Sequence, residues 1–170
     1  MRYTSAEANK LLKRLEGRIS DIKRKETLAS SFLVASGEDE ESLRPPYDFA
    51  GVQKQLDELE AEVRKVKHAI NGFNLTHELP GFDGMTVDQA LVYIPQLTER
   101  ISKLRGMSEV LPKQRVNDTF RASFVDYKVC NYDIADAESG YAEAKRMLEA
   151  LHLGLDTVNS SETMEIDIEE

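Results

Sequence analysis

One stretch of the sequence, residues 49–73, constrains the fold more than any other. Its apolar residues follow one another at alternating spacings of three and four positions: Phe49, Val52, Leu56, Leu59, Val63, Val66, Ile70 and Phe73. This spacing places them along one side of a helix of about seven turns, as in a coiled coil or a helical bundle. Burying such a seam is worth roughly 12–24 kcal/mol before the ordering of the backbone is subtracted. The helix therefore needs partner helices.

A second seam with the same alternating spacing lies towards the C-terminal end of the sequence. It consists of Ile134, Ala137, Tyr141, Ala144, Leu148, Leu151, Leu155 and Val158. Two more amphipathic segments begin with capping boxes, in which Thr4 precedes Glu7 and Thr86 precedes Gln89 by three positions. Four helices joined in sequence predict a mainly α protein, an antiparallel, coiled-coil-like four-helix bundle that forms one domain over residues 1–170.

The first and third connectors of this bundle are longer than the usual 2–8 residues. In an up-and-down bundle both leave from the same end, where we expect short strand-like connectors. Residues 32–34 (Phe-Leu-Val) and residues 124–129 (Phe-Val-Asp-Tyr-Lys-Val) have the apolar, β-branched and aromatic content of strands, and our hypothesis is that they pair. The tail, residues 164–168, alternates apolar and acidic residues and predicts an edge strand or a docking tail.

Composition limits the classes of partner and the compartment. The chain has 31 acidic and 22 basic residues and a net charge of −9, which disfavours generic binding to DNA. Its single cysteine, Cys130, rules out an internal disulfide, and neither a signal-peptide pattern nor a membrane-spanning run is visible. We therefore expect a cytoplasmic protein that binds neither DNA nor membranes.

No arrangement of residues in the sequence indicates catalysis or metal binding. Glu149 and His152 have the i, i+3 spacing of di-iron carboxylate bundles, but the second such pair and the inward-facing glutamates are missing. His68 and His77 lack the spacing of metal ligands, and no serine, cysteine and histidine residues suggest a nucleophilic triad. We expect no enzyme, no catalytic or metal-binding residues and no cofactor.

Local charge indicates one candidate binding segment. Between Arg100 and Arg121, six basic residues accompany two acidic ones, a net charge of +4. Because guanidinium forks suit phosphates and carboxylates, and tyrosine rings can stack on bases, this segment predicts a site for a small anionic, nucleotide-like ligand. The candidate ligand-binding residues are Lys113, Arg115, Arg121, Tyr127 and Tyr132. The alternative is that the basic residues pair with the acidic residues 38–41 of the same chain or of a neighbouring one.

Several short strings in the sequence resemble those of small uncharacterised proteins of bacterial and phage genomes. They are Tyr47-Asp48-Phe49, residues 66–71, residues 85–89, Leu111-Pro112-Lys113 and residues 165–168. More distantly, Ile70, Asn71, Asn74 and Thr76, followed by a helix that carries Arg100 and Leu104-Arg105, are similar to the septicolysin-like family of helical bundle proteins. Both resemblances imply a helical fold and an oligomeric habit, and neither implies catalytic residues.

Three functions are compatible with these observations. The first is a non-enzymatic, oligomeric helical-bundle protein of bacterial or phage origin that binds or interacts with partners. The second is a phage-type sponge that sequesters a small anionic nucleotide signal and so evades bacterial immunity. The third is a septicolysin-like, toxin-related protein. The long apolar seams, the strand-like connectors and the apolar tail expose more apolar surface than a small monomer usually does. Association would bury this surface, so we expect a homo-oligomer.

Overall fold

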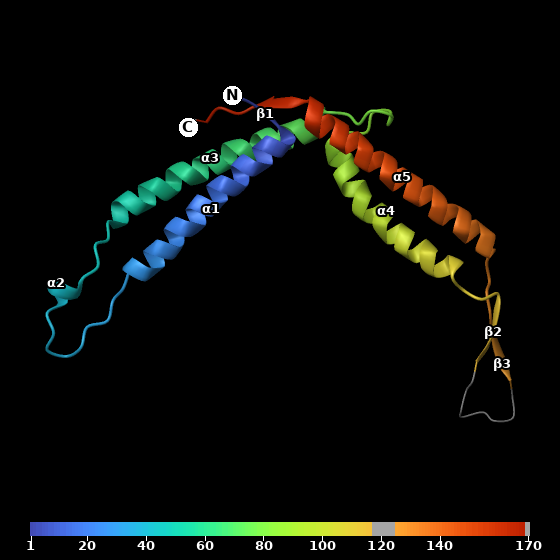
Figure 1. The fold of residues 1–170 in the computed structure, drawn as a ribbon, viewed down its shortest axis with the longest axis horizontal. Helices are drawn as coiled ribbons and strands as arrows, with labels where there is room; N and C mark the ends of the chain where they lie inside the picture. The colour runs from blue at the N-terminus through green and yellow to red at the C-terminus, as the bar shows by residue number, and fades with distance from the viewer. Residues whose placement is uncertain (117–124, 169–170) are drawn as a thin grey trace. The chain divides into compact units, whose positions relative to one another are not determined.

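A computed structural model describes residues 1–116 and 125–168 of the chain (Figure 1). The chain is mainly helical, as predicted. In sequence order its elements are β1 (Arg2–Thr4), α1 (Ser5–Ala29), α2 (Glu40–Leu43), α3 (Phe49–Thr76), α4 (Val87–Ser108), β2 (Lys113–Val116), β3 (Asp126–Val129), α5 (Ile134–Ser161) and β4 (Thr163–Glu165). The four long helices are confirmed, whereas their assembly into one four-helix bundle stays a prediction.

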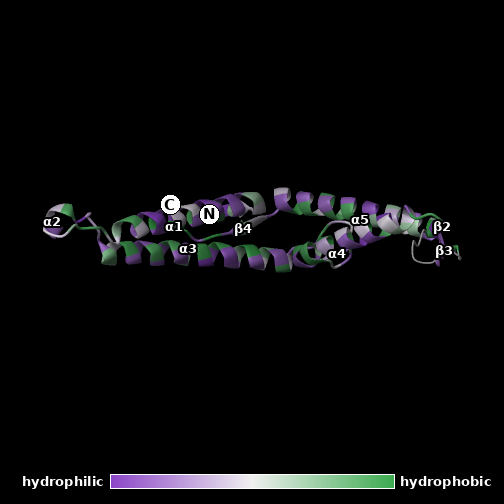
Figure 2. Cartoon of the chain, turned by 90° about the horizontal axis from the view of Figure 1, so that it is seen from below, coloured by the Kyte–Doolittle hydropathy of each residue, from purple (hydrophilic) through white to green (hydrophobic). Residues whose placement is uncertain are grey.

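The chain divides into two compact units. Unit 1 comprises Met1–Thr76 and Asn159–Glu170, and unit 2 comprises His77–Val158. Unit 1 contains the antiparallel helices α1 and α3 (Figure 1). Unit 2 contains all of α4 and most of α5, which are also antiparallel (Figure 1). Apolar and polar positions alternate along each long helix (Figure 2). Each unit therefore builds its own core from one pair of helices.

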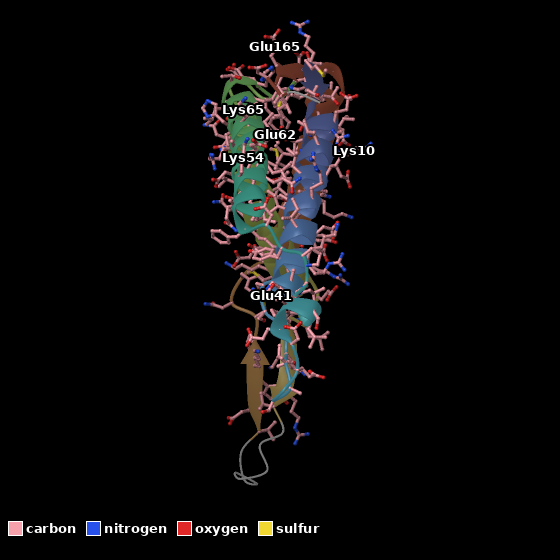
Figure 3. The ribbon with its side chains drawn as sticks, turned by 90° about the vertical axis from the view of Figure 1, so that its left-hand side faces the viewer. Lys10, Glu41, Lys54, Glu62, Lys65 and Glu165 are labelled. Carbon is pink, nitrogen blue, oxygen red and sulfur yellow. The ribbon has the colours of Figure 1, made fainter. Side chains whose placement is uncertain are left out.

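In unit 1, α1 begins where its sequence predicts. The N–H of Glu7 donates to Oγ1 of Thr4 (3.3 Å), and the N–H of Thr4 donates to Oε2 of Glu7 (2.9 Å), which completes the capping box. The pKa of Glu7 is lowered first by the hydrogen bond from the Thr4 N–H to its carboxylate and then by the Thr4 hydroxyl, which also donates to Oε2 of Glu7 (3.0 Å). The charged residues Lys10, Lys54 and Lys65 lie on the outer sides of the helix pair (Figure 3).

The core of unit 1 does not extend along the whole predicted seam. Its buried helical residues are Ser5, Ala8, Leu11 and Leu15 of α1 and Leu56, Leu59, Val66 and Phe73 of α3. In contrast, Val52 and Val63 are only half-buried, and Phe49 at the start of the seam is 65 % exposed. The seam prediction is therefore confirmed in the middle and at the end of α3 and is wrong at Phe49.

The tail is a strand that covers the core of unit 1. β4 pairs antiparallel with β1, with Tyr3 opposite Met164, and it lies against α3. The N–H of Ile166 donates to the Met1 carbonyl oxygen (3.0 Å), and the Met1 nitrogen donates to the Ile166 carbonyl oxygen (3.1 Å). The side chains of Met164 and Ile166 are buried, whereas those of the residues that follow each of them, Glu165 and Asp167, are exposed. The alternating pattern of the tail thus becomes one buried and one exposed face of a strand.

Unit 2 begins with a tight turn that leads into α4. Gly81 and Gly84 have positive φ values of 82° and 69°, which suit glycine, and the N–H of Leu79 donates to the Met85 carbonyl oxygen (2.8 Å). Leu79 is buried against α5, because a Cβ added to Gly154 would stand 3.3 Å from its Cδ2 atom. The other buried apolar residues of this unit are Val87, Ala90, Leu97, Ala137, Ala144, Leu151, Leu155 and Val158.

Candidate functional site

The connector between α4 and α5 forms a β-hairpin. In it β2 and β3 pair antiparallel, with Arg115 opposite Tyr127 and Lys113 opposite Val129. The predicted strand in residues 124–129 is therefore confirmed over Asp126–Val129, and Phe124 lies outside the described residues. The hypothesis that it pairs with residues 32–34 is wrong: those residues form no strand, and β3 pairs with β2. A partner nearby in sequence costs less loop-closure entropy than a distant one.

The hairpin brings three of the predicted ligand-binding residues onto one face. Residues directly opposite each other share a face of an antiparallel pair, and successive residues alternate between faces. One face therefore carries Lys113, Arg115, Tyr127 and Val129, and the other carries Gln114, Val116, Asp126 and Lys128. On the first face, Nζ of Lys113 lies 4.3 Å from the centroid of the Tyr127 ring, a cation–π contact. This face has the basic and aromatic character that the sequence predicts.

The other two predicted residues do not join this face. The hydroxyl of Tyr132 donates to the Met107 carbonyl oxygen (2.8 Å) and so ties the base of the hairpin to the end of α4. The pKa of Tyr132 is raised mainly by partial desolvation and, to a smaller extent, by its interactions with the Cys130 side chain. Arg121 lies outside the described residues. Tyr132 therefore has a structural contact, and its predicted stacking role stays a prediction.

A pocket of about 600 Å³ lies at the base of the hairpin. Its volume falls within the range of small-molecule sites. The lining comprises Glu109, Val110, Leu111, Gln114, Lys128, Val129, Cys130, Asn131 and Tyr132. Of the described ligand-binding candidates, Tyr132 lines this pocket, whereas Lys113, Arg115 and Tyr127 do not. The pocket and the basic face therefore share only Val129.

Unit 1 contains a second pocket, of about 460 Å³, that the sequence did not indicate. It forms where the segment Pro46-Tyr47-Asp48 folds against the second half of α1. Oε1 of Glu26 accepts hydrogen bonds from the Tyr47 hydroxyl and from Nε2 of Gln53, both 2.7 Å long. The bond to Glu26 is the main reason why the pKa of Tyr47 is raised. The lining mixes Arg18 and Lys25 with acidic side chains, so it selects no single sign of charge.

The charges of the hairpin have few partners within the chain. No ion pair among residues 1–116 and 125–168 involves Lys113, Arg115 or Lys128. In the acidic connector, Glu41 pairs with Arg44 (3.1 Å). The alternative pairing of the basic segment with residues 38–41 of a neighbouring copy stays a prediction.

In the part of the chain that the structure describes, no group of three or more His, Cys, Asp or Glu side chains is placed to hold a metal ion. None of the described helices has the length and apolar character needed to cross a membrane.

The fold has a counterpart among solved structures. The chain is similar to the crystal structure of a functionally unknown conserved protein from Corynebacterium diphtheriae, with a TM-score of 0.60 and 17% sequence identity over 97% of this chain and 100% of that chain. No family model matches the sequence, and no curated protein is significantly similar to it. At this identity, the similarity supports the fold alone.

Proposed function

We propose that this chain is a non-enzymatic, homo-oligomeric binding protein of bacterial or phage origin that acts in the cytoplasm through its exposed connectors. The observation that carries the proposal is the β2–β3 hairpin. All eight of its strand residues are exposed, including the apolar side chains of Val116, Tyr127 and Val129. A two-stranded hairpin with no further cover is marginally stable in water, so exposed apolar side chains on it favour a partner surface.

We further propose that the four long helices assemble into one antiparallel, coiled-coil-like bundle within a single domain over residues 1–170. The support is the incomplete burial of apolar positions along the long helices. Ile19 and Val63 in unit 1 and Ile101 and Leu104 in unit 2 are only half-buried. Packing against further helices would remove these apolar side chains from water.

The first prediction concerns the mass of the protein in solution. At micromolar concentration, light scattering should give a mass that is a multiple of the 19.2 kDa of one chain, because soluble assemblies of this kind are mostly closed and symmetric. A monomer across the whole concentration range would contradict the oligomeric function.

A second candidate function is sequestration of a small anionic nucleotide, as in a phage-type sponge. The contact between Lys113 and the Tyr127 ring at 4.3 Å, with Arg115 on the same face, favours it. Such a face offers charge for a phosphate and a ring for a base.

A thermal-shift screen with cyclic and linear nucleotides tests this candidate. A ligand at 100 times its dissociation constant adds about 2.7 kcal/mol to the free energy of unfolding. Arg115→Ala should then weaken the affinity by about 1.5–3 kcal/mol, the worth of a hydrogen bond to a charged group. Arg146→Ala on α5, outside the hairpin, should leave the affinity unchanged. Equal affinities for both variants would remove the hairpin from consideration as the nucleotide site.

A further inference from the structure

We propose that the free edge of β3 pairs with β3 of a second copy of this chain, antiparallel and centred on Tyr127, so that two hairpins form one four-stranded sheet. This inference rests on the oligomeric function proposed above and names the surface and the register. The direction of the backbone groups, the charges along each edge and the exposed side chains support this pairing.

The hydrogen bonds of the hairpin determine which backbone groups of β3 are available. The N–H of Cys130 donates to the Pro112 carbonyl oxygen (2.9 Å), just beyond the pair Lys113–Val129. Residues of an antiparallel ladder alternate between those whose N–H and C=O groups point to the partner strand and those whose groups point away. Because Cys130 points to β2, so do Lys128 and Asp126. The N–H and C=O groups of Tyr127 and Val129 therefore point to the edge of β3 that pairs with no other described strand. The same alternation places those of Val125, the residue before β3, at this edge.

Three outward-facing residues allow only a few two-fold registers. In the register centred on Tyr127, this residue is opposite its own copy, and Val125 is opposite Val129 of the second copy. Asp126 is then opposite Lys128 of the second copy, and this ion pair occurs twice. A shift of the centre to residue 126 places two aspartates opposite each other, and a shift to residue 128 places two lysines opposite each other. Like charges at such positions are destabilising and opposite charges are favourable, so the charges select the Tyr127 register.

The edge of β2 does not offer the same pairing. In each two-fold register centred on residues 113, 114 or 115, at least one of its exposed residues Lys113 and Arg115 is opposite a basic residue of the second copy. Charged side chains of one sign are a common protection of edge strands. With the β2 edge blocked and the β3 edge self-complementary, the pairing ends with two copies and does not continue into a filament.

Side chains on the sheet face also favour the second copy. Val125, Tyr127 and Val129 share one face by alternation and are 51 %, 52 % and 62 % exposed. In the four-stranded sheet, these residues from both copies form one continuous apolar stripe, and Lys113 over each Tyr127 ring borders it. Three or more strands with an apolar face have the stability that an isolated hairpin lacks.

Charge reversal at residues 126 and 128 tests the register. Asp126→Lys and Lys128→Asp each place like charges opposite one another twice across the two-fold axis. Each variant alone should raise the dimer dissociation constant about tenfold or more in sedimentation velocity, because two favourable pairs become unfavourable. The double variant Asp126→Lys/Lys128→Asp restores both pairs and should recover the wild-type dissociation constant.

A mixture of the two single variants gives the sharpest outcome. One copy then carries lysine and the other aspartate at both positions, so each cross-strand pair joins opposite charges. The mixture should form a heterodimer with wild-type affinity, detected by native mass spectrometry of one isotopically labelled variant. The helical circular dichroism of both variants should match the wild type, since all eight hairpin residues are exposed.

The outcomes separate this inference from the proposed function. If both single variants associate as the wild type does, the β3 edge is not the interface, although the oligomeric function stands. If the single variants dissociate but neither the double variant nor the mixture reassociates, the register is wrong. A monomeric wild type overturns both proposals.

Discussion

Val66→Asp is expected to unfold unit 1. The Val66 side chain is 0 % exposed and lies in the middle of α3, where a carboxylate would have no access to water. An unpaired charge in a core costs several kcal/mol, which is comparable with the total stability of about 5–15 kcal/mol of a typical domain. Far-UV circular dichroism with urea unfolding should show a large loss of the free energy of unfolding or no folded baseline at all.

The matched control is Val92→Asp, which makes the same chemical change on a helix surface. Val92 is 58 % exposed on the surface of α4, where a carboxylate keeps its contact with water. The free energy of unfolding should change by no more than about 0.5 kcal/mol. If the two variants unfolded at the same urea concentration, the seam of α3 would not be the core of the unit.

The second large effect is expected in the tail. In the double variant Met164→Ala/Ile166→Ala, both side chains by which the tail covers the core of unit 1 are truncated; they are 7 % and 2 % exposed. Removing a buried methionine or isoleucine side chain costs about 2–5 kcal/mol, so the double variant should lose about 4 kcal/mol or more. Urea unfolding followed by circular dichroism measures this loss.

Glu165→Ala/Asp167→Ala is the control within the same strand. It removes the exposed side chains of the tail and one ion pair, between Nε of Arg2 and Oε1 of Glu165 at 3.5 Å. Exposed ion pairs are worth about 0–1 kcal/mol, so this double variant should remain close to the wild type in stability. A loss as large as that of the first double variant would mean that the exposed side chains of the tail, and not the two buried ones, carry its contribution to stability.

The sequence predicts the long helices well because their signals are local. Each capping box involves residues three positions apart, and both boxes, at Thr4 and at Thr86, are present. The apolar spacing places Leu56, Leu59, Val66 and Phe73 on the buried side of α3. Burial at the start of a seam depends on a partner that the spacing does not identify, which is why Phe49 is exposed despite its position.

Pairing between distant segments is the part of the fold that the sequence did not predict. The strand character of residues 164–168 was visible, but nothing in the alternation identifies residues 2–4 as the partner of β4. For residues 32–34, apolar content suggested a strand, although among the described residues they pair with no other segment. A strand requires a partner, and short apolar runs carry no information about where that partner lies.

The candidate site was partly predictable, because alternation along a strand is local whereas the role of each side chain is not. Alternation within a hairpin puts Lys113 and Arg115 on one face, and the register adds Tyr127. Tyr132 comes after the last strand residue, Val129, and at the base of the hairpin its hydroxyl donates to the carbonyl oxygen of Met107. Composition alone does not distinguish a tyrosine that ties two elements together from one that is available to a ligand.

The pairing of β1 with β4 also affects the order in which the units form during synthesis on the ribosome. Unit 2 is contiguous in sequence, whereas unit 1 is completed only by residues that follow unit 2. The helices α1 and α3 emerge first, yet the surface that Met164 and Ile166 cover stays open until the tail has been translated. Unit 2 can therefore finish folding while the first-made helices still expose part of their core to solvent or to chaperones. The nascent chain would complete its units in the reverse of the order in which they are begun.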